Sequence, residues 1–167
     1  MAISDYLRSL RSRIGRELVL MPAVAVMIRD AQGRLLLVRD HDTGQWQTVG
    51  GAMDPGEEPA AAAVREAYEE TGLVVEPTRI LGVHGGPRFR LTYPNGDVVE
   101  YVGISFAARV VGGTERPCHD EVDRLGWFAE AEALALAVAP HTRLLIAEAF
   151  RDAPEAGFAA PAGYPAG

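Results

Sequence analysis

The chain has 167 residues, of which 48% are hydrophobic and 23% charged, a balance that suits one compact globular domain rather than a fibrous or disordered chain. Its formal net charge of −7 makes it a poor general binder of nucleic acid. The single cysteine, Cys118, excludes an intrachain disulfide and a thiolate metal cluster. Because no apolar run is long enough for a bilayer and no signal region is visible, we expect a cytoplasmic protein without a membrane partner.

The chain begins with a segment that has helical spacing of apolar residues. Over Ile3–Ile14 the aliphatic and aromatic side chains recur on one stripe, Ser4 suits the N-cap, and Gly15 suits the stop. At the other end Ala, Pro and Gly dominate, which is typical of a mobile tail. We therefore expect an N-terminal amphipathic helix in residues 1–16, a main domain in residues 17–152, and a flexible tail in residues 153–167.

Between these ends, aliphatic-rich runs bounded by turn residues predict strands. They are Leu18–Arg29, Arg34–Arg39, a short run ending at Val49, Thr78–Val83, Arg88–Tyr93, Val98–Val110 and Leu125–Phe128. Helical patterns cover Pro59–Thr71, Glu130–Ala137 and His141–Arg151. Strands interrupted by single helices favour a mixed α/β (α+β) layered domain.

The helix predicted for Pro59–Thr71 carries an unusual cluster of carboxylates. Glu66, Glu69 and Glu70 stand at i, i+3 and i+4, so they share one helix face, where like charges repel. Oxygen ligands gathered in this way suit a hard divalent cation such as Mg²⁺ or Mn²⁺. Glu57 lies just before the helix and can join them. The alternative is a solvated acidic helix face, which we would favour for these three glutamates alone.

The wider pattern resembles the Nudix box of the MutT-like hydrolases. Every position of that box is filled, by Gly51, Glu57, Arg65, Glu66, Ala67, Glu69, Glu70, Gly72 and Leu73. The resemblance extends over residues 20–150 and implies a Nudix-like α/β/α sandwich, with a mixed sheet and a loop-helix-loop motif. It also implies a Mg²⁺-dependent pyrophosphohydrolase, with Mn²⁺ as a possible substitute.

The resemblance assigns roles to particular residues. The implied metal ligands are the carbonyl of Gly50 and the carboxylates of Glu57, Glu66, Glu69 and Glu70. Arg65 is implied to orient a box carboxylate through a bidentate pair. The general base is Glu66 or Glu69 inside the box, or Glu121 outside it. Glu121 is equally well explained as a surface carboxylate in an acidic stretch.

The substrate is left open among a nucleoside triphosphate, ADP-ribose or another nucleotide sugar, and a dinucleotide polyphosphate. With no lysine in the chain, Arg39, Arg88 and Arg90 are the candidates for phosphate contacts, although each also suits a strand-edge surface position. Trp46 or Tyr101 can stack on a base, and packing is the alternative for both.

Two other functions are compatible with this fold. A catalytically silent nucleotide-binding or regulatory module is expected to have lost box carboxylates, and all four remain here. An isomerase acting on a prenyl diphosphate needs an active-site cysteine and metal-binding histidines that this chain lacks at suitable places. A homodimer is possible, and the expected partner is a nucleotide-type small molecule rather than a nucleic acid.

Overall fold

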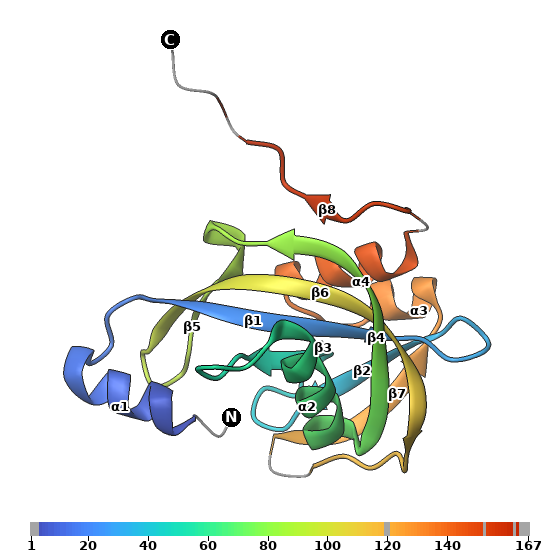
Figure 1. The fold of residues 1–167 in the computed structure, drawn as a ribbon, viewed down its shortest axis with the longest axis horizontal. Helices are drawn as coiled ribbons and strands as arrows, with labels where there is room; N and C mark the ends of the chain where they lie inside the picture. Colours follow the sequence, from blue (N-terminus) through green and yellow to red (C-terminus); the bar gives the residue numbers. More distant parts are fainter. Residues whose placement is uncertain (1–3, 119–120, 152, 162, 164–167) are drawn as a thin grey trace.

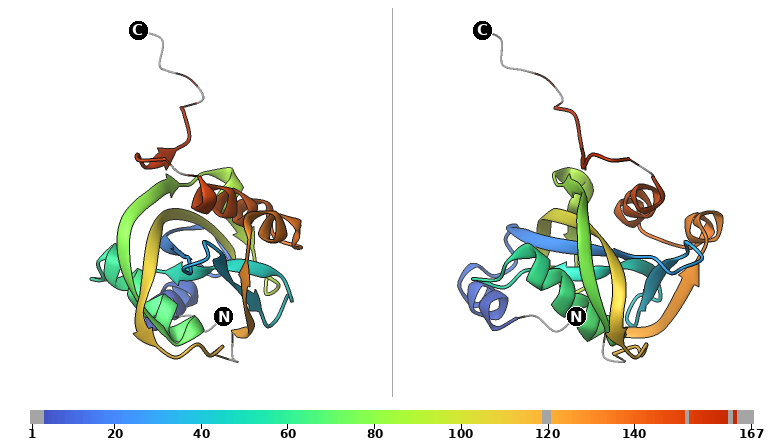
Figure 2. Two further views of the ribbon diagram at one scale, coloured as in Figure 1. Left: turned by 90° about the vertical axis from the view of Figure 1, so that its right-hand side faces the viewer. Right: turned by 45° about the vertical axis from the view of Figure 1, so that its right-hand side comes forward.

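A twisted mixed sheet separates two helical layers in the computed structural model, which describes residues 4–118, 121–151, 153–161 and 163 (Figures 1 and 2). The strands are β1 (Val19–Ile28), β2 (Leu35–Asp40), β3 (Trp46–Ala52), β4 (Leu73–His84), β5 (Arg90–Thr92), β6 (Val98–Gly113), β7 (Val122–Phe128) and β8 (Gly157–Phe158). The helices are α1 (Asp5–Ile14), α2 (Pro59–Thr71), α3 (Glu130–Ala135), α4 (Pro140–Phe150) and the short 3-10 helix η1 (Pro87–Phe89).

The strand order is β7-β2-β3-β1-β6-β4-β8, and β5 pairs with β6 beside this path. The central pair β1 and β6 is parallel, whereas β3 with β1, β2 with β3 and β4 with β6 are antiparallel. Helix α2 lies on one face of the sheet, and α3 and α4 lie on the other (Figure 2). The predicted α/β/α sandwich with a mixed sheet is confirmed.

Helix α2 has the bounds that its sequence predicts. Pro59 stands in its first turn, and Gly72 ends it in a left-handed conformation, with its N–H donating to the Tyr68 carbonyl. The face turned to the sheet is small and fully buried, through Ala62 and Ala63. Small residues let the helix axis approach the sheet closely, which brings the charged residues at its rim near β3.

The strand that follows α2 begins earlier than predicted. We expected it at Thr78, but β4 starts at Leu73, which pairs with Gly113 of β6. The left-handed cap at Gly72 turns the chain directly into the sheet, so no loop is needed. This tight connection fixes the end of α2 to the sheet.

The predicted end of the third strand at Val49 is also wrong. Strand β3 continues to Ala52, with Gly50 opposite Ala25 and Gly51 opposite Val24 of β1. The two glycines thus belong to the strand. Their lack of side chains serves close approach, as the site geometry demonstrates.

Further bounds differ from the sequence predictions: β6 continues to Gly113 rather than Val110, and β7 begins at Val122 rather than Leu125. The run predicted as a strand from Arg88 forms η1 first, and only Arg90–Thr92 pairs with β6. Within the predicted tail, Gly157–Phe158 forms β8 against β4, while residues 162 and 164–167 lie outside the described residues.

Helix α1 is capped by Ser4, whose side chain accepts from the Leu7 N–H; the predicted start at Ile3 lies outside the described residues. No helix within the described ranges is long and apolar enough to cross a membrane.

Candidate active site

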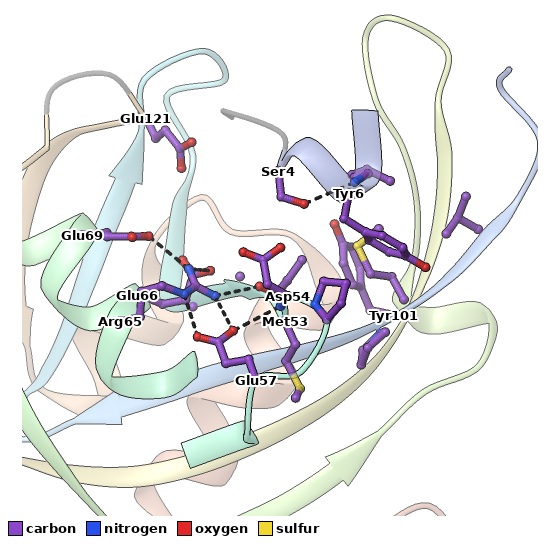
Figure 3. Close-up of a pocket in the computed structure, with 18 of the residues that line it drawn as sticks. Ser4, Tyr6, Met53, Asp54, Glu57, Arg65, Glu66, Glu69, Tyr101 and Glu121 are labelled. Atoms are coloured by element: carbon purple, nitrogen blue, oxygen red, sulfur yellow. Dashed lines mark hydrogen bonds and ion pairs between the residues drawn. The ribbon is translucent and has the colours of Figure 1, made fainter. Parts of the chain in front are cut away.

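Arg65 stands at the centre of the carboxylate cluster. Its Nε and Nη2 atoms donate to the two oxygens of Glu57 at 2.8 and 2.9 Å. Its Nη1 donates to Glu66 Oε1 at 2.8 Å and to Glu69 Oε2 at 3.1 Å, and Nη2 also reaches the carbonyl of Ala52. The guanidinium therefore joins the loop before α2, the helix itself and the end of β3 into one unit (Figure 3).

The three glutamates of the helix lie in different environments, although they share a helix face. Glu69 is the most accessible, with 57% of its side chain exposed, while Glu66 is mostly buried and Glu70 is buried. Burial raises the pKa of Glu66, opposed by Arg65. Burial also raises the pKa of Glu70 well above its ordinary value, and repulsion from Glu66 and Glu121 adds to this. Arg65 lowers the pKa of Glu57.

The glycines of β3 make room for these carboxylates. The N–H of Gly50 donates to Glu70 Oε2 at 3.0 Å. A Cβ on Gly51 would lie 2.6 Å from Glu66 Oε1, and one on Gly50 would collide with the Val24 carbonyl oxygen. Gly50 also has a φ of 141°, which side-chain-bearing residues rarely adopt. A side chain at either position would therefore clash with its surroundings at the rim of the carboxylate cluster.

These carboxylates open into a cavity of about 690 Å³, which we call the carboxylate pocket. Glu121 lines it together with Asp40, from the side of the sheet that carries β2 and β7. Ser4 and Tyr6, at the start of α1, lie across the pocket from Glu66 and Glu69 (Figure 3). The structure thus brings Glu121 to the same pocket as the box glutamates, although it is distant in sequence.

The residues present fit a hard divalent cation. Burial and repulsion from neighbouring carboxylates both disfavour the charged form of Glu70. A bound cation would offset both the burial of this charge and the repulsion. The donor set is all oxygen. Within the described ranges no three acidic, His or Cys side chains already form a closed ligand set, because Glu57, Glu66 and Glu69 are turned toward Arg65.

The arginines predicted to contact phosphate lie elsewhere. Arg39 forms a bidentate pair with Asp123, and Arg90 pairs with Glu100. Arg88 is exposed in η1. None of the three lines the carboxylate pocket. Sequence spacing could not reveal the pair of Arg39 with Asp123, since these residues are 84 positions apart.

A second cavity of about 350 Å³ adjoins the first, and we call it the aromatic pocket. Trp46, Phe89 and Tyr101 line it, and Gly50, Gly51 and Tyr101 line both pockets. Trp46 also packs edge-on against Phe128, with ring centroids 4.9 Å apart. Trp46 and Tyr101, the two residues predicted to stack on a base, therefore both face a cavity.

A buried polar cluster borders the aromatic pocket, and sequence reasoning missed it. Glu148 of α4 accepts a hydrogen bond from Ser105 Oγ at 2.5 Å, and His84 Nε2 lies 2.9 Å from the same carboxylate oxygen. His84 stacks on Phe89 with centroids 5.3 Å apart. The one sequence signal was a glutamate among the apolar residues of Leu144–Phe150, which does not identify its partners.

Comparison with known proteins agrees with this geometry. A family model described as "NUDIX domain" matches residues 19–163. A MutT-like protein of Streptomyces ambofaciens is 30% identical over 110 residues, which cover 66% of this chain and 64% of that protein. An RNA pyrophosphohydrolase of Roseobacter denitrificans is 39% identical over 62 residues, covering 36% of this chain and 39% of that protein.

The matched segments thus span less than two thirds of either relative. The crystal structure of a MutT protein from Methanosarcina mazei superimposes with a TM-score of 0.66 at 24% identity, covering 80% of this chain and 94% of that one. With the family model matched over most of its length, this chain belongs to the NUDIX family.

Proposed function

We propose that the chain is a Mg²⁺-dependent pyrophosphohydrolase acting on a nucleoside diphosphate linked to another group. The observation that carries this proposal is the joining of Glu57, Glu66 and Glu69 by one arginine at the mouth of a cavity, with Glu70 buried behind them. Such a charge cluster stabilises no fold by itself. Pre-positioned carboxylates are what phosphoryl transfer requires, because that chemistry depends on positioning and electrostatics.

In this proposal Glu57, Glu66, Glu69, Glu70 and the Gly50 carbonyl hold the divalent ion. When bound, the ion neutralises phosphate charge and lowers the pKa of water. Arg65 is a positioning residue, because its guanidinium donates hydrogen bonds to three of the four carboxylates. Mn²⁺, with the same preference for oxygen, should support the reaction as well.

The remaining role is that of the general base. Glu121 lines the same pocket as Glu66 and Glu69, yet it lies outside the arginine cluster. A water bound between Glu121 and the box glutamates would have carboxylates on two sides. We assign proton removal from the attacking water to Glu121, with Glu66 and Glu69 as the competing assignments.

A hydrolysis screen tests the proposal. Purified protein is incubated with Mg²⁺ or Mn²⁺ and a set of nucleoside triphosphates, nucleotide sugars and dinucleotide polyphosphates, and phosphorus-31 NMR follows the products. We expect metal-dependent cleavage of at least one substrate and its loss in a Glu69→Gln/Glu70→Gln variant. If the wild type cleaves none while binding a nucleotide, the chain is a silent binding module. If the variant cleaves as fast as the wild type, the metal site is misassigned.

A further inference from the structure

The carboxylate pocket extends well beyond the carboxylates. Its volume of about 690 Å³ lies within the range of sites that bury whole organic ligands, and it is larger than a pyrophosphate group requires. At its far end the lining is apolar and aromatic, through Tyr6, Leu7, Leu10, Leu20 and Met53. The aromatic pocket is also lined by Gly50 and Gly51. The carboxylates therefore open into a cavity with room for an organic group, and a second cavity adjoins it at Gly50, Gly51 and Tyr101.

Helix α1 supplies one wall of this outer cavity, and it lies outside the matched family domain, which starts at residue 19. The helix is held firmly in place. Its Leu7, Leu10 and Ile14 pack against the apolar cluster at the start of β1. Arg11, almost fully buried, donates to the carbonyls of Val98, Gly15 and Glu17. An anchored helix that leaves Tyr6 53% exposed toward a cavity presents a rigid aromatic surface.

The charge of the pocket limits its ligand. Among the described residues that line it, Arg65 is the only basic side chain, and Arg65 is already bonded to three carboxylates. All the other charged residues of the lining are acidic. A nucleoside triphosphate ends in an unesterified phosphate carrying about −2 at pH 7, which would find no cation besides the bound metal. A diphosphate esterified at both ends lacks that terminal charge.

We propose that this site is built for a diphosphate that carries an organic group on each phosphate, and that Tyr6 of α1 determines this specificity by packing on the outer group. This inference rests on the proposed hydrolase function. Water adds to one phosphorus, the bond to the bridging oxygen breaks, and two monophosphates leave, each with its own organic group. The bridging oxygen stays on the leaving phosphate, and the water proton goes to the base.

The outer group can be a sugar or a second nucleoside, since both pack on an aromatic ring. The experiment therefore compares ADP-ribose, diadenosine diphosphate and ATP at equal Mg²⁺. We expect kcat/KM to be at least about tenfold higher for one or both diesters than for ATP. The better diester identifies the outer group as a sugar or a nucleoside.

The Tyr6→Ala variant tests the wall itself, and Arg13→Ala is its matched control, because Arg13 is exposed on α1 and does not line the pocket. Tyr6→Ala should lower kcat/KM for the preferred diester about tenfold, while ATP hydrolysis and the melting temperature stay unchanged. Arg13→Ala should leave the hydrolysis of both substrates and the melting temperature unchanged. Equal or faster turnover of ATP by the wild type, or equal losses for all substrates in Tyr6→Ala, would overturn the inference.

A binding measurement separates this inference from the proposed function. Calorimetry with methylene-bridged analogues of ADP-ribose and ATP reports affinity without cleavage. If nothing is hydrolysed but the diester analogue binds more tightly and depends on Tyr6, the hydrolase proposal fails and the specificity stands. If substrates are hydrolysed but both analogues bind equally, the hydrolase proposal stands and the specificity fails. Equal binding without hydrolysis defeats both.

Discussion

Arg65 binds both carboxylate oxygens of Glu57, eight residues earlier in the chain, through its Nε and Nη2 atoms. The pair closes the loop between β3 and α2 onto the helix. The same guanidinium also contacts Glu66 and Glu69, so one side chain sets the positions of three acidic groups. Arg65 therefore affects catalysis by fixing the positions of these carboxylates.

We therefore predict that Arg65→Lys impairs catalysis although it keeps the charge. Lysine cannot form the planar bidentate pair, so the carboxylates lose their fixed positions. We expect kcat to fall about 10–100-fold and the Mg²⁺ concentration for half-maximal rate to rise. Arg34→Lys is the control, because Arg34 pairs with Asp30 in a remote turn. Steady-state kinetics that do not distinguish the two variants would remove Arg65 from its positioning role.

The adjacent glycines of β3 should respond differently to the same substitution. In Gly51→Ala the new Cβ meets the end of the Glu66 side chain, which can swing away, so activity should fall about tenfold or more with little loss of stability. In Gly50→Ala it meets the backbone of Val24 at a positive φ, so the fold itself should lose about 1–3 kcal/mol or more. Urea unfolding and kcat, measured on both variants, check this. The expectation is contradicted if Gly51→Ala is the less stable variant.

Sequence reasoning succeeded where the determinants are local. The bounds of α2 follow from Pro59 and Gly72, and the family follows from residues that lie within 23 positions of one another, Gly51 to Leu73. It failed where partners are distant in the chain. No sequence neighbour of Arg39 indicates that its guanidinium pairs with Asp123. Likewise, no sequence neighbour of Tyr6 indicates that α1 reaches the carboxylate pocket. The strand through Gly50 was missed because glycine has poor strand propensity, which pairing with β1 overrides.

Glu121 is the site residue whose role most needs a direct test. If it removes the proton from the attacking water, Glu121→Gln should lower kcat by about 10²–10⁴-fold, with the apparent affinity for Mg²⁺ little changed. Glu58→Gln is the matched control, since Glu58 is exposed, makes no side-chain cap bond and does not line the pocket. A loss of only a few-fold at unchanged metal affinity would assign the base to Glu66 or Glu69.

The buried cluster around Glu148 predicts a pH-dependent contribution to stability. Burial raises the pKa of this carboxyl, but hydrogen bonds from His84 and Ser105 outweigh burial and bring the pKa below its ordinary value of 4.5. Arg151 lies 3.4 Å from the other carboxylate oxygen and acts in the same direction. The folded state therefore binds this proton less readily than the unfolded state. Its stabilising effect is complete well above pH 4.5 and is lost as the pH falls below that value.

Glu148→Gln removes the titrating group while keeping the shape of the side chain. At pH 7 the variant should be less stable than the wild type by about 1–3 kcal/mol, because hydrogen bonds to a charged acceptor are lost. The gap should narrow as the pH falls from 5 toward 3, since the wild-type carboxyl then becomes neutral as well. Urea unfolding across this range measures it, and Glu155→Gln, at an exposed position, is the control. A gap that stays constant with pH would mean that packing around Glu148, rather than its charge, holds α4 to the sheet.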